Sequence, residues 1–267
     1  MRAHGLRYSK SYGQNFLTDR NTLEKIVDAA KLNPSDHVVE IGAGLGALTI
    51  LLAQASEQVT AIEIDRKIIP ALREAIEGLD NIDIVNDDFL KMGFVSPQPY
   101  KLVGNLPYYI TTPIVAKLFE PGPDGFRPRP PSLSVLMIQK EVAERLVSLT
   151  GKKTYGAISV LVQYYAEAEI LFNVSREVFV PKPGVDSTVI RLKPRDVSED
   201  DTAVTARMFR LVRSGFDMRR KTLKNSLSRA GFSEEKLLAA LAKADIDPTR
   251  RAETLSPRDF YTLASYL

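Results

Sequence analysis

Short runs of β-branched and aliphatic residues alternate with segments of helical period along the first part of the chain. These runs predict strands at His37–Ile41, Gln58–Ile64, Ile82–Val85, Tyr100–Val103 and Ser134–Ile138. The apolar spacing predicts helices at Leu48–Ala53, Ile68–Ile76 and Glu141–Leu149, and a helical face of Leu23, Ile26, Val27 and Ala30. Strands that alternate with helices form parallel βαβ units, so we expect a largely parallel sheet covered on both faces.

The pattern changes after Tyr155. Two further runs, Ala168–Val174 and Ser187–Leu192, have the composition of strands, with no helix of the usual length between them. A parallel connection needs a crossover of a dozen or more residues, usually a helix. We therefore expect these two strands to form an antiparallel pair that closes the edge of the sheet.

A polar break at Lys193–Thr202 is typical of a linker. From Ala203 to the end the helical period dominates, which predicts a small domain of three or four helices. The expected fold is therefore α/β: a Rossmann-like sheet, parallel with an antiparallel edge, followed by a small C-terminal all-α domain. We place these domains at residues 1–195 and 196–267.

Composition narrows the possible classes. Of 267 residues, 44% are hydrophobic and 26% are charged, which fits a globular protein and excludes a disordered or fibrous one. The absence of cysteine excludes disulfides, thiolate metal sites and a cysteine nucleophile. His4 and His37 are too isolated for a histidine-based metal site, so we expect no metal. No apolar run reaches the ~18 residues of a membrane span and no secretory signal is recognisable, so we expect a cytoplasmic protein that does not bind membranes.

Positive charge is concentrated in one region. The net charge is +3. Between Thr205 and Ala230 there are eight basic residues and a single acid, Asp217. A polyanion-binding face explains this excess, although a solvated helix face is the alternative. We favour nucleic acid as the partner.

A glycine-rich loop, Gly42-Ala43-Gly44-Leu45-Gly46-Ala47, follows the first strand and opens a helix. Glycines allow a tight turn and let a ligand approach the backbone. Glu63 ends the next strand, 21 residues after Gly42, where a carboxylate can accept hydrogen bonds from ribose hydroxyls. Gly42, Gly44 and Ala47 also satisfy the dinucleotide fingerprint, so at this point a nicotinamide-dependent dehydrogenase stays open, as does a turn without a ligand.

Two further acids favour a different cofactor. Glu40 lies two residues before the first glycine, and Asp88 follows the third strand, where it can accept from an adenine amino group. Asp88 could also be a solvated turn acid. Acids after each of the first three strands resemble those of class I S-adenosylmethionine-dependent methyltransferases. We therefore predict S-adenosylmethionine as the cofactor, with Gly42, Gly44, Glu63 and Asp88 among its contacts.

The segment Asn105-Leu106-Pro107-Tyr108 follows the fourth strand and resembles the (N/D)-P-P-(Y/F) signature of amino-methyltransferases. The exocyclic amine of adenine is a poor nucleophile because its lone pair is delocalised into the ring. The Asn105 side-chain carbonyl and the Leu106 backbone carbonyl can hold its two hydrogens and orient the lone pair. Pro107 shapes the turn, and Tyr108 offers a ring on which the base can stack. We expect catalysis by positioning and charge complementarity, without a strong base.

Nearly the whole chain resembles the KsgA/RsmA family, which dimethylates N6 of two adjacent adenosines near the 3′ end of small-subunit (16S) ribosomal RNA. Three segments carry the resemblance besides Asn105–Tyr108. They are Gly13–Leu17 (GQNFL), Phe179–Ser187 (FVPKPGVDS) and Arg219–Leu227 (RRKTLKNSL). A nicotinamide-dependent dehydrogenase explains neither Asn105–Tyr108 nor the basic helical domain.

The resemblance implies a role for further residues. Asn15, Leu17 and Asn105 join the predicted cofactor contacts. Phe179 becomes the second face of a base sandwich with Tyr108, although from the residues alone it is a core aromatic. The implied RNA-binding residues are Arg219, Arg220, Lys221 and Lys224. The implied partner is small-subunit rRNA in a pre-ribosomal particle, bound by a monomer.

Two positions depart from the family pattern, and two other functions stay open. Tyr109 stands where Asn is frequent, which concerns local loop packing and not activity. Ala43 replaces a common Pro in the glycine loop, which should loosen that turn slightly. One alternative is the antibiotic-resistance type of enzyme, which dimethylates an adenosine of large-subunit rRNA. The other is a ribosome-assembly factor that acts mainly by binding.

Overall fold

The computed structural model describes four stretches of the chain: residues 13–93, 98–119, 129–197 and 200–267. The chain divides into two compact units. The first consists of Met1–Ala143 with Glu167–Pro194, and the second of Glu144–Ala166 with Arg195–Leu267. Glu144–Ala166 therefore groups with the C-terminal helices, whereas the sequence analysis placed it with the sheet.

A seven-stranded sheet forms the centre of the first unit, in the order β4-β3-β2-β5-β6-β9-β7. Its strands are β2 (His37–Ile41), β3 (Gln58–Ile62), β4 (Ile82–Val85), β5 (Tyr100–Asn105), β6 (Leu133–Gln139), β7 (Ala166–Val174) and β9 (Ser187–Pro194). The first five pair in parallel, and β9 runs antiparallel to β6. The predicted parallel sheet with an antiparallel edge is confirmed.

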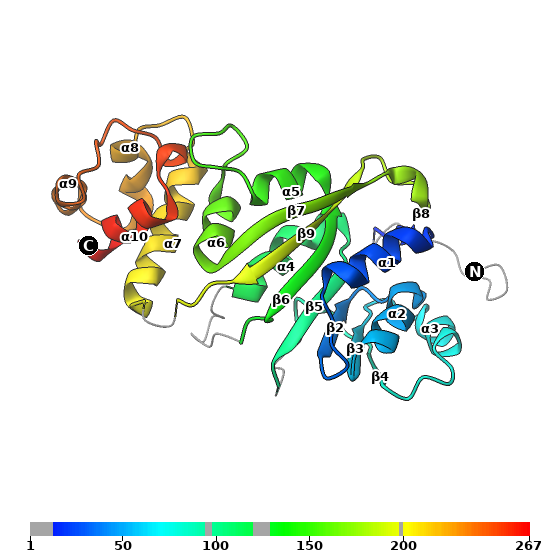
Figure 1. The fold of residues 1–267 in the computed structure, drawn as a ribbon. Helices are drawn as coiled ribbons and strands as arrows, with labels where there is room; N and C mark the ends of the chain where they lie inside the picture. Colours follow the sequence, from blue (N-terminus) through cyan, green and yellow to red (C-terminus); the bar gives the residue numbers. More distant parts are fainter. Residues whose placement is uncertain (1–12, 94–97, 120–128, 198–199) are drawn as a thin grey trace. The chain divides into compact units, whose positions relative to one another are not determined.

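Helices cover the two faces of this sheet. They are α1 (Arg20–Ala29), α2 (Ala47–Ala55), α3 (Ile69–Ala75) and α4 (Thr111–Phe119). A further helix, α5 (Lys140–Leu146), follows β6 and crosses the boundary between the two units after Ala143. Figure 1 shows α1, α2 and α3 on one side of the sheet and α4 on the other. Helix α1 begins after Asp19, whose carboxylate accepts from the backbone N–H of Thr22 and so caps the first turn.

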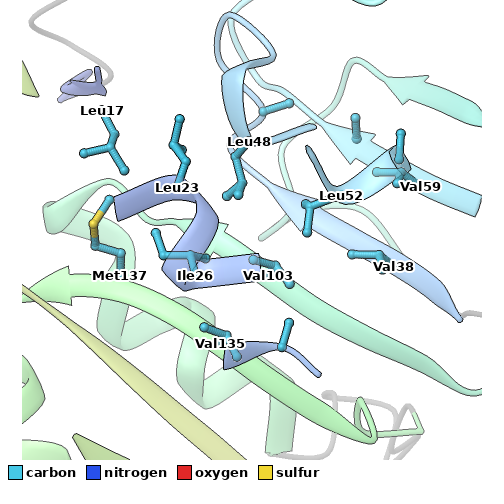
Figure 2. Close-up of a cluster of buried hydrophobic side chains, with 14 of the residues drawn as sticks. Leu17, Leu23, Ile26, Val38, Leu48, Leu52, Val59, Val103, Val135 and Met137 are labelled. Atoms are coloured by element: carbon cyan, nitrogen blue, oxygen red, sulfur yellow. The ribbon is translucent and has the colours of Figure 1, made fainter. Parts of the chain in front are cut away.

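The core lies between the sheet and helices α1 to α3, where aliphatic side chains of both layers interdigitate (Figure 2). Val38 of β2 and Val103 of β5 point into this layer with Ile26 of α1. Alternate strand residues such as Val39 and Leu102 point to the opposite face and are also fully buried. A parallel sheet buried on both faces requires such continuous apolar strands, which is why the sequence identifies them readily.

A second, two-stranded sheet joins two distant segments. Strand β1 (Phe16–Leu17) pairs antiparallel with β8 (Phe179–Val180), with Leu17 opposite Phe179. Both the backbone N–H and the side-chain hydroxyl of Thr18 also donate to the carbonyl of Val178, at 2.9 Å. This pairing brings the GQNFL segment beside FVPKPGVDS, and the sequence analysis did not predict it.

The described part of the second unit contains no strand except the first residue of β7. Its helices are α6 (Ala157–Tyr165), α7 (Thr202–Asp217), α8 (Leu223–Leu227), α9 (Glu234–Lys243) and α10 (Pro257–Ser265). The predicted C-terminal helical region is therefore present. Helix α6 was not predicted because it is short and apolar on most sides. Tyr165 of α6 stacks on Phe209 of α7, with 5.4 Å between ring centroids. No helix in the described ranges is long and apolar enough to cross a bilayer.

Candidate active site

A cavity of about 410 Å³ opens at the carboxyl ends of the parallel strands in the first unit. It lies beside β2, where the chain order of the strands reverses, which is the usual ligand site of such sheets. Ten of the predicted site residues line it: Asn15, Leu17, Gly42, Gly44, Glu63, Asp88, Asn105, Leu106, Pro107 and Tyr108. The structure thus brings together residues that lie as far apart in sequence as Asn15 and Tyr108.

The glycine loop lines one wall of this cavity, and at Gly42 and Gly44 no side chain covers the backbone. Gly42 and Gly44 have φ of +80° and +56°, in the left-handed region that favours glycine. A Cβ atom on Gly44 would lie 3.1 Å from the ring of Phe16, and one on Gly42 would lie 3.3 Å from the carbonyl of Asn105. Both positions therefore require glycine for backbone conformation and for space.

Glu63 is held as a buried carboxylate beside the glycine loop. Its Oε2 accepts from the N–H of Gly44 and its Oε1 from the N–H of Asp65, both at 2.8 Å. Burial raises the pKa of Glu63, and the two backbone donors oppose that shift. Each carboxylate oxygen keeps a second acceptor position, which suits a ligand with paired hydroxyl groups.

Glu40 is a second buried acid on the wall of the same cavity. It is 1% exposed, and burial raises its pKa to about 7, with the negative charge of Glu63 adding to the shift. Within the described residues its Oε2 has no hydrogen-bond partner. Because buried polar atoms are usually satisfied, an acceptor without a donor at the cavity wall makes this carboxyl a candidate for contact with a bound group. Glu40 was not among the site residues predicted from the sequence.

Asp88 lies on a turn that a distant lysine holds in place. Its Oδ1 accepts from the backbone N–H of Leu90 at 2.9 Å. Lys117 of α4 donates from Nζ to the carbonyls of Phe89, Leu90 and Met92, at 2.6, 3.0 and 2.7 Å. Burial lowers the pKa of Lys117. Sequence reasoning missed Lys117, because no local pattern marks a residue that acts on a turn 25 to 28 positions away.

Asn105 presents its carbonyl as a hydrogen-bond acceptor. Its Nδ2 donates to the backbone carbonyl of Asn15 at 3.0 Å. A backbone carbonyl can only accept, so this bond fixes the amide orientation and leaves Oδ1 free for another donor. The turn after Asn105 is anchored as well, since the N–H of Leu106 donates to the carbonyl of Met137 at 3.0 Å. Pro107 has φ −57°, its ordinary value.

Tyr108 is oriented by a buried serine. Its hydroxyl lies 2.7 Å from Oγ of Ser187, which is fully buried at the start of β9. Burial raises the pKa of Tyr108, so the phenol is neutral at ordinary pH. Tyr109, one of the two departures from the family pattern, is 56% exposed, and its ring lies beside Gly13.

Phe179 is the predicted site residue that the structure does not bring to the cavity. It is 2% exposed and belongs to the hydrophobic core, where it pairs with Leu17 across the two-stranded sheet. In this conformation Phe179 is therefore the core aromatic that the residues alone suggested. The stacking role implied by the family resemblance stays a prediction, and it requires the ring to become accessible.

The four predicted RNA-binding residues lie in the second unit and differ in their surroundings. Arg219 forms an ion pair with Glu253 at 3.0 Å, and Lys224 forms one with Glu234 at 2.7 Å. Arg220 and Lys221 are exposed, and in the described part of the chain no ion pair or hydrogen bond engages their side chains. A search for a metal site gives no candidate: among the described residues, no group of three or more His, Asp or Glu side chains is placed to hold a metal ion.

Comparison with known proteins agrees with this geometry. The family model described as ribosomal RNA adenine dimethylase matches residues 5–267. Ribosomal RNA small subunit methyltransferase A of Clostridioides difficile is 43% identical, over 99% of this chain and 92% of its own length. A dimethyladenosine transferase from Plasmodium falciparum superimposes with a TM-score of 0.80 at 30% identity, covering 93% of this chain and 95% of that one.

A second solved structure is similar to almost the same extent. The 23S rRNA methyltransferase ErmE gives a TM-score of 0.72 at 31% identity, covering 95% of this chain and 99% of that one. Both structures superimpose over more than nine-tenths of this chain, which contains the mostly parallel sheet and the C-terminal helical region, so the predicted fold class is confirmed. The resemblance noted in the sequence is confirmed as well, and the chain belongs to the ribosomal RNA adenine dimethylase family.

Proposed function

We propose that this protein transfers methyl groups from S-adenosylmethionine to N6 of two adjacent adenosines near the 3′ end of small-subunit (16S) rRNA. The product is dimethyladenosine, formed while the small subunit matures. The curated relatives, at 42–45% identity, carry the small-subunit name, which supports this substrate. The observation that carries the chemistry is the bond from Asn105 Nδ2 to the carbonyl of Asn15, which fixes the amide so that its Oδ1 remains the acceptor.

The cavity has the donor and acceptor groups that S-adenosylmethionine needs. The side-chain-free wall at Gly42 and Gly44 admits a ligand close to the backbone. Glu63 offers two oxygens to ribose hydroxyls, and Asp88 offers an acceptor to the adenine amino group. The unpartnered Oε2 of Glu40 suits an ammonium group. When bound, the cofactor supplies an electrophilic methyl group on a positively charged sulfur.

The protein's part in the reaction is to orient the target amine. Asn105 Oδ1 and the Leu106 carbonyl accept its two hydrogens, so that the nitrogen lone pair points out of the ring plane. As the new N–C bond forms, the nitrogen becomes acidic and releases one proton to water, so no strong base is required. Stacking on Tyr108 contributes ~1–3 kcal/mol to holding a base that has left its own stack.

An Asn105→Ala variant tests this mechanism. We expect the transfer rate to small-subunit particles to fall about 10²–10³-fold, the usual cost of one preorganised hydrogen-bonding group at a reacting centre. RNA binding should not change. Asn33→Ala, at an exposed asparagine outside the cavity, is the matched control and should transfer at the wild-type rate. Wild-type turnover by Asn105→Ala would contradict the proposed role of the amide.

The similarity to a 23S rRNA methyltransferase supports a second candidate, dimethylation of large-subunit rRNA. The segments Phe179–Ser187 and Arg219–Leu227 favour the small-subunit enzyme, as do the names of the curated relatives. A pre-ribosomal particle as the substrate, a cytoplasmic location and a monomeric state belong to the same proposal. A role limited to assembly would leave the complete set of cavity residues without a use.

A further inference from the structure

The guanidinium group of Arg219 forms hydrogen bonds with other residues of the protein. One guanidinium nitrogen, Nη2, donates to the backbone carbonyls of Lys153 and Tyr155 at 2.9 and 3.0 Å. The same nitrogen lies 3.0 Å from Oε2 of Glu253. All four residues belong to the second unit. Arg219 therefore fastens the loop between α5 and α6 to the segment that follows α7.

Further bonds hold the same loop to the 3₁₀ turn at Ala252–Thr254. The N–H of Gly151 donates to the carbonyl of Glu253 at 2.7 Å, and the hydroxyl of Tyr155 donates to the carbonyl of Leu255 at 3.0 Å. Tyr155 is fully buried. The loop is thus held at Gly151 and at Tyr155, and its two lysines, Lys152 and Lys153, lie between these two points.

These two lysines, together with Arg220 and Lys221, form a compact positively charged surface. Lys152 and Lys153 are exposed, as are Arg220 and Lys221. Within the described stretches, none of the four side chains has an ion-pair or hydrogen-bond partner. The nearby acid, Glu253, is already paired with Arg219. The four cations are therefore uncompensated and available for an anionic partner.

We propose that Lys152 and Lys153 of the α5–α6 loop form one phosphate-binding surface for rRNA with Arg220 and Lys221 of the short connection between α7 and α8. We call it the loop–hinge surface, with 'hinge' used only as the name of that connection. Arg219 is its positioning residue and not a phosphate contact. The inference rests on the proposed function, which supplies the polyanion. It adds a loop that the sequence analysis did not associate with RNA, and it gives Arg219 a role different from that of its neighbour Arg220.

The salt dependence of binding tests the surface, because each phosphate contact contributes about 0.7–0.9 to the slope of log K against log salt concentration. With a protein-free fragment of small-subunit rRNA as the probe, Lys152→Ala/Lys153→Ala should reduce that slope by about 1.5. The matched control is Lys236→Ala/Lys243→Ala, which removes two exposed lysines of α9 and should leave the slope unchanged. An unchanged slope in the first double variant, or an equal loss in the control, would overturn the surface.

Two charge-conserving variants separate positioning from contact. Arg219→Lys keeps the charge but cannot reach its three acceptors together, so RNA affinity should fall about as far as in Lys152→Ala/Lys153→Ala. Arg258→Lys, at an exposed arginine of α10 outside the proposed surface, is the matched control and should bind like wild type, and Glu253→Gln should reproduce part of the Arg219→Lys loss. Thermal unfolding of each variant shows whether the unit stays folded. Wild-type affinity in Arg219→Lys, or equal losses in both arginine variants, would contradict a positioning role.

The outcomes distinguish this proposal from the function on which it rests. If wild-type protein transfers methyl groups to rRNA while the lysine variant keeps its salt slope, only the loop–hinge surface is wrong. If wild-type protein transfers no methyl group, the proposed function is wrong. If the lysine variant loses affinity for particles but not for protein-free RNA, the surface contacts a protein of the particle, and the assignment to RNA is overturned.

Discussion

Two buried carboxyl groups lie at the wall of the same cavity: Glu40 lies in β2, and Glu63 directly follows the neighbouring strand β3. Burial raises the pKa of both, and that of Glu40 reaches about 7. An acid whose pKa is higher in the folded than in the unfolded protein costs stability as pH rises from its unfolded pKa through its folded one. Glu40 therefore weakens the cofactor-free protein near neutral and alkaline pH.

We expect Glu40→Gln to stabilise the cofactor-free protein above pH 7. The shift from 4.5 to about 7 corresponds to about 3 kcal/mol at full ionisation. Below pH 4.5 the carboxyl group of Glu40 is protonated, so wild type and Glu40→Gln should have the same free energy of unfolding. Free energies of unfolding from denaturant titrations at several pH values check this. A difference that does not depend on pH would show that Glu40 is not the titrating group.

Tyr108 and Ser187 form a pair whose coupling can be measured directly. Tyr108→Phe and Ser187→Ala each remove one partner of the 2.7 Å contact. Each should slow methyl transfer by several-fold, equivalent to about 1 kcal/mol, while cofactor affinity stays near wild type. The double variant should lose no more than either single variant. Additive losses would show that the serine does not orient the tyrosine.

At the scale of elements, helix α4 supports the turn after β4 through Lys117. The ammonium group satisfies the carbonyls of Phe89, Leu90 and Met92, which hold the turn that carries Asp88. Lys117→Met should leave these carbonyls poorly satisfied and weaken S-adenosylmethionine binding about tenfold, since a lost charged hydrogen bond costs about 1.5–3 kcal/mol.

Lys91→Met is the control for that variant. Nζ of Lys91 lies 3.7 Å from Oδ2 of Asp88, but the lysine side chain is 84% exposed. Such surface ion pairs contribute little free energy. Calorimetric titration with the cofactor should give wild-type affinity for Lys91→Met and the loss only for Lys117→Met. A loss of affinity for Lys91→Met but not for Lys117→Met would contradict this account. It would show that the positive charge next to Asp88, and not support of the turn, favours cofactor binding.

The elements that sequence predicts best are those with a strong local signal. Strands β2 and β4 begin and end at the predicted residues, because buried parallel strands are short apolar runs. Helix α6 was missed, since a nine-residue apolar segment has no clear amphipathic period. The pairing of β1 with β8 was missed as well. Two-residue strands carry no periodic signal, and their partners lie far apart in the sequence.

The candidate site shows the same division between local and distant information. Asn105, Glu63 and Asp88 were predicted because each follows a recognisable strand. The bond that orients Asn105 spans 90 positions, and the contacts of Arg219 with the loop span 64 and 66. No local pattern encodes such contacts. The burial of Phe179 likewise follows from its pairing with Leu17 and not from its own neighbours.

At the scale of the whole molecule, the two units divide the proposed work. The first contains every residue of the cavity, and the second contains the loop–hinge surface. Residues 144–166 belong to the second unit although they lie within the chain of the first, so the boundary is not a single linker. We propose that the first unit is the catalytic domain and that the second, with this segment, is the RNA-binding domain.

Methyl transfer from labelled S-adenosylmethionine tests the central claim most directly. The wild-type protein is offered undermethylated small-subunit particles and, separately, large-subunit rRNA, and the labelled nucleosides are identified by mass spectrometry. The account predicts dimethyladenosine at two adjacent positions near the 3′ end of the small-subunit RNA, and none in the large-subunit RNA. Label in large-subunit RNA, or tight particle binding without label in either RNA, would contradict it.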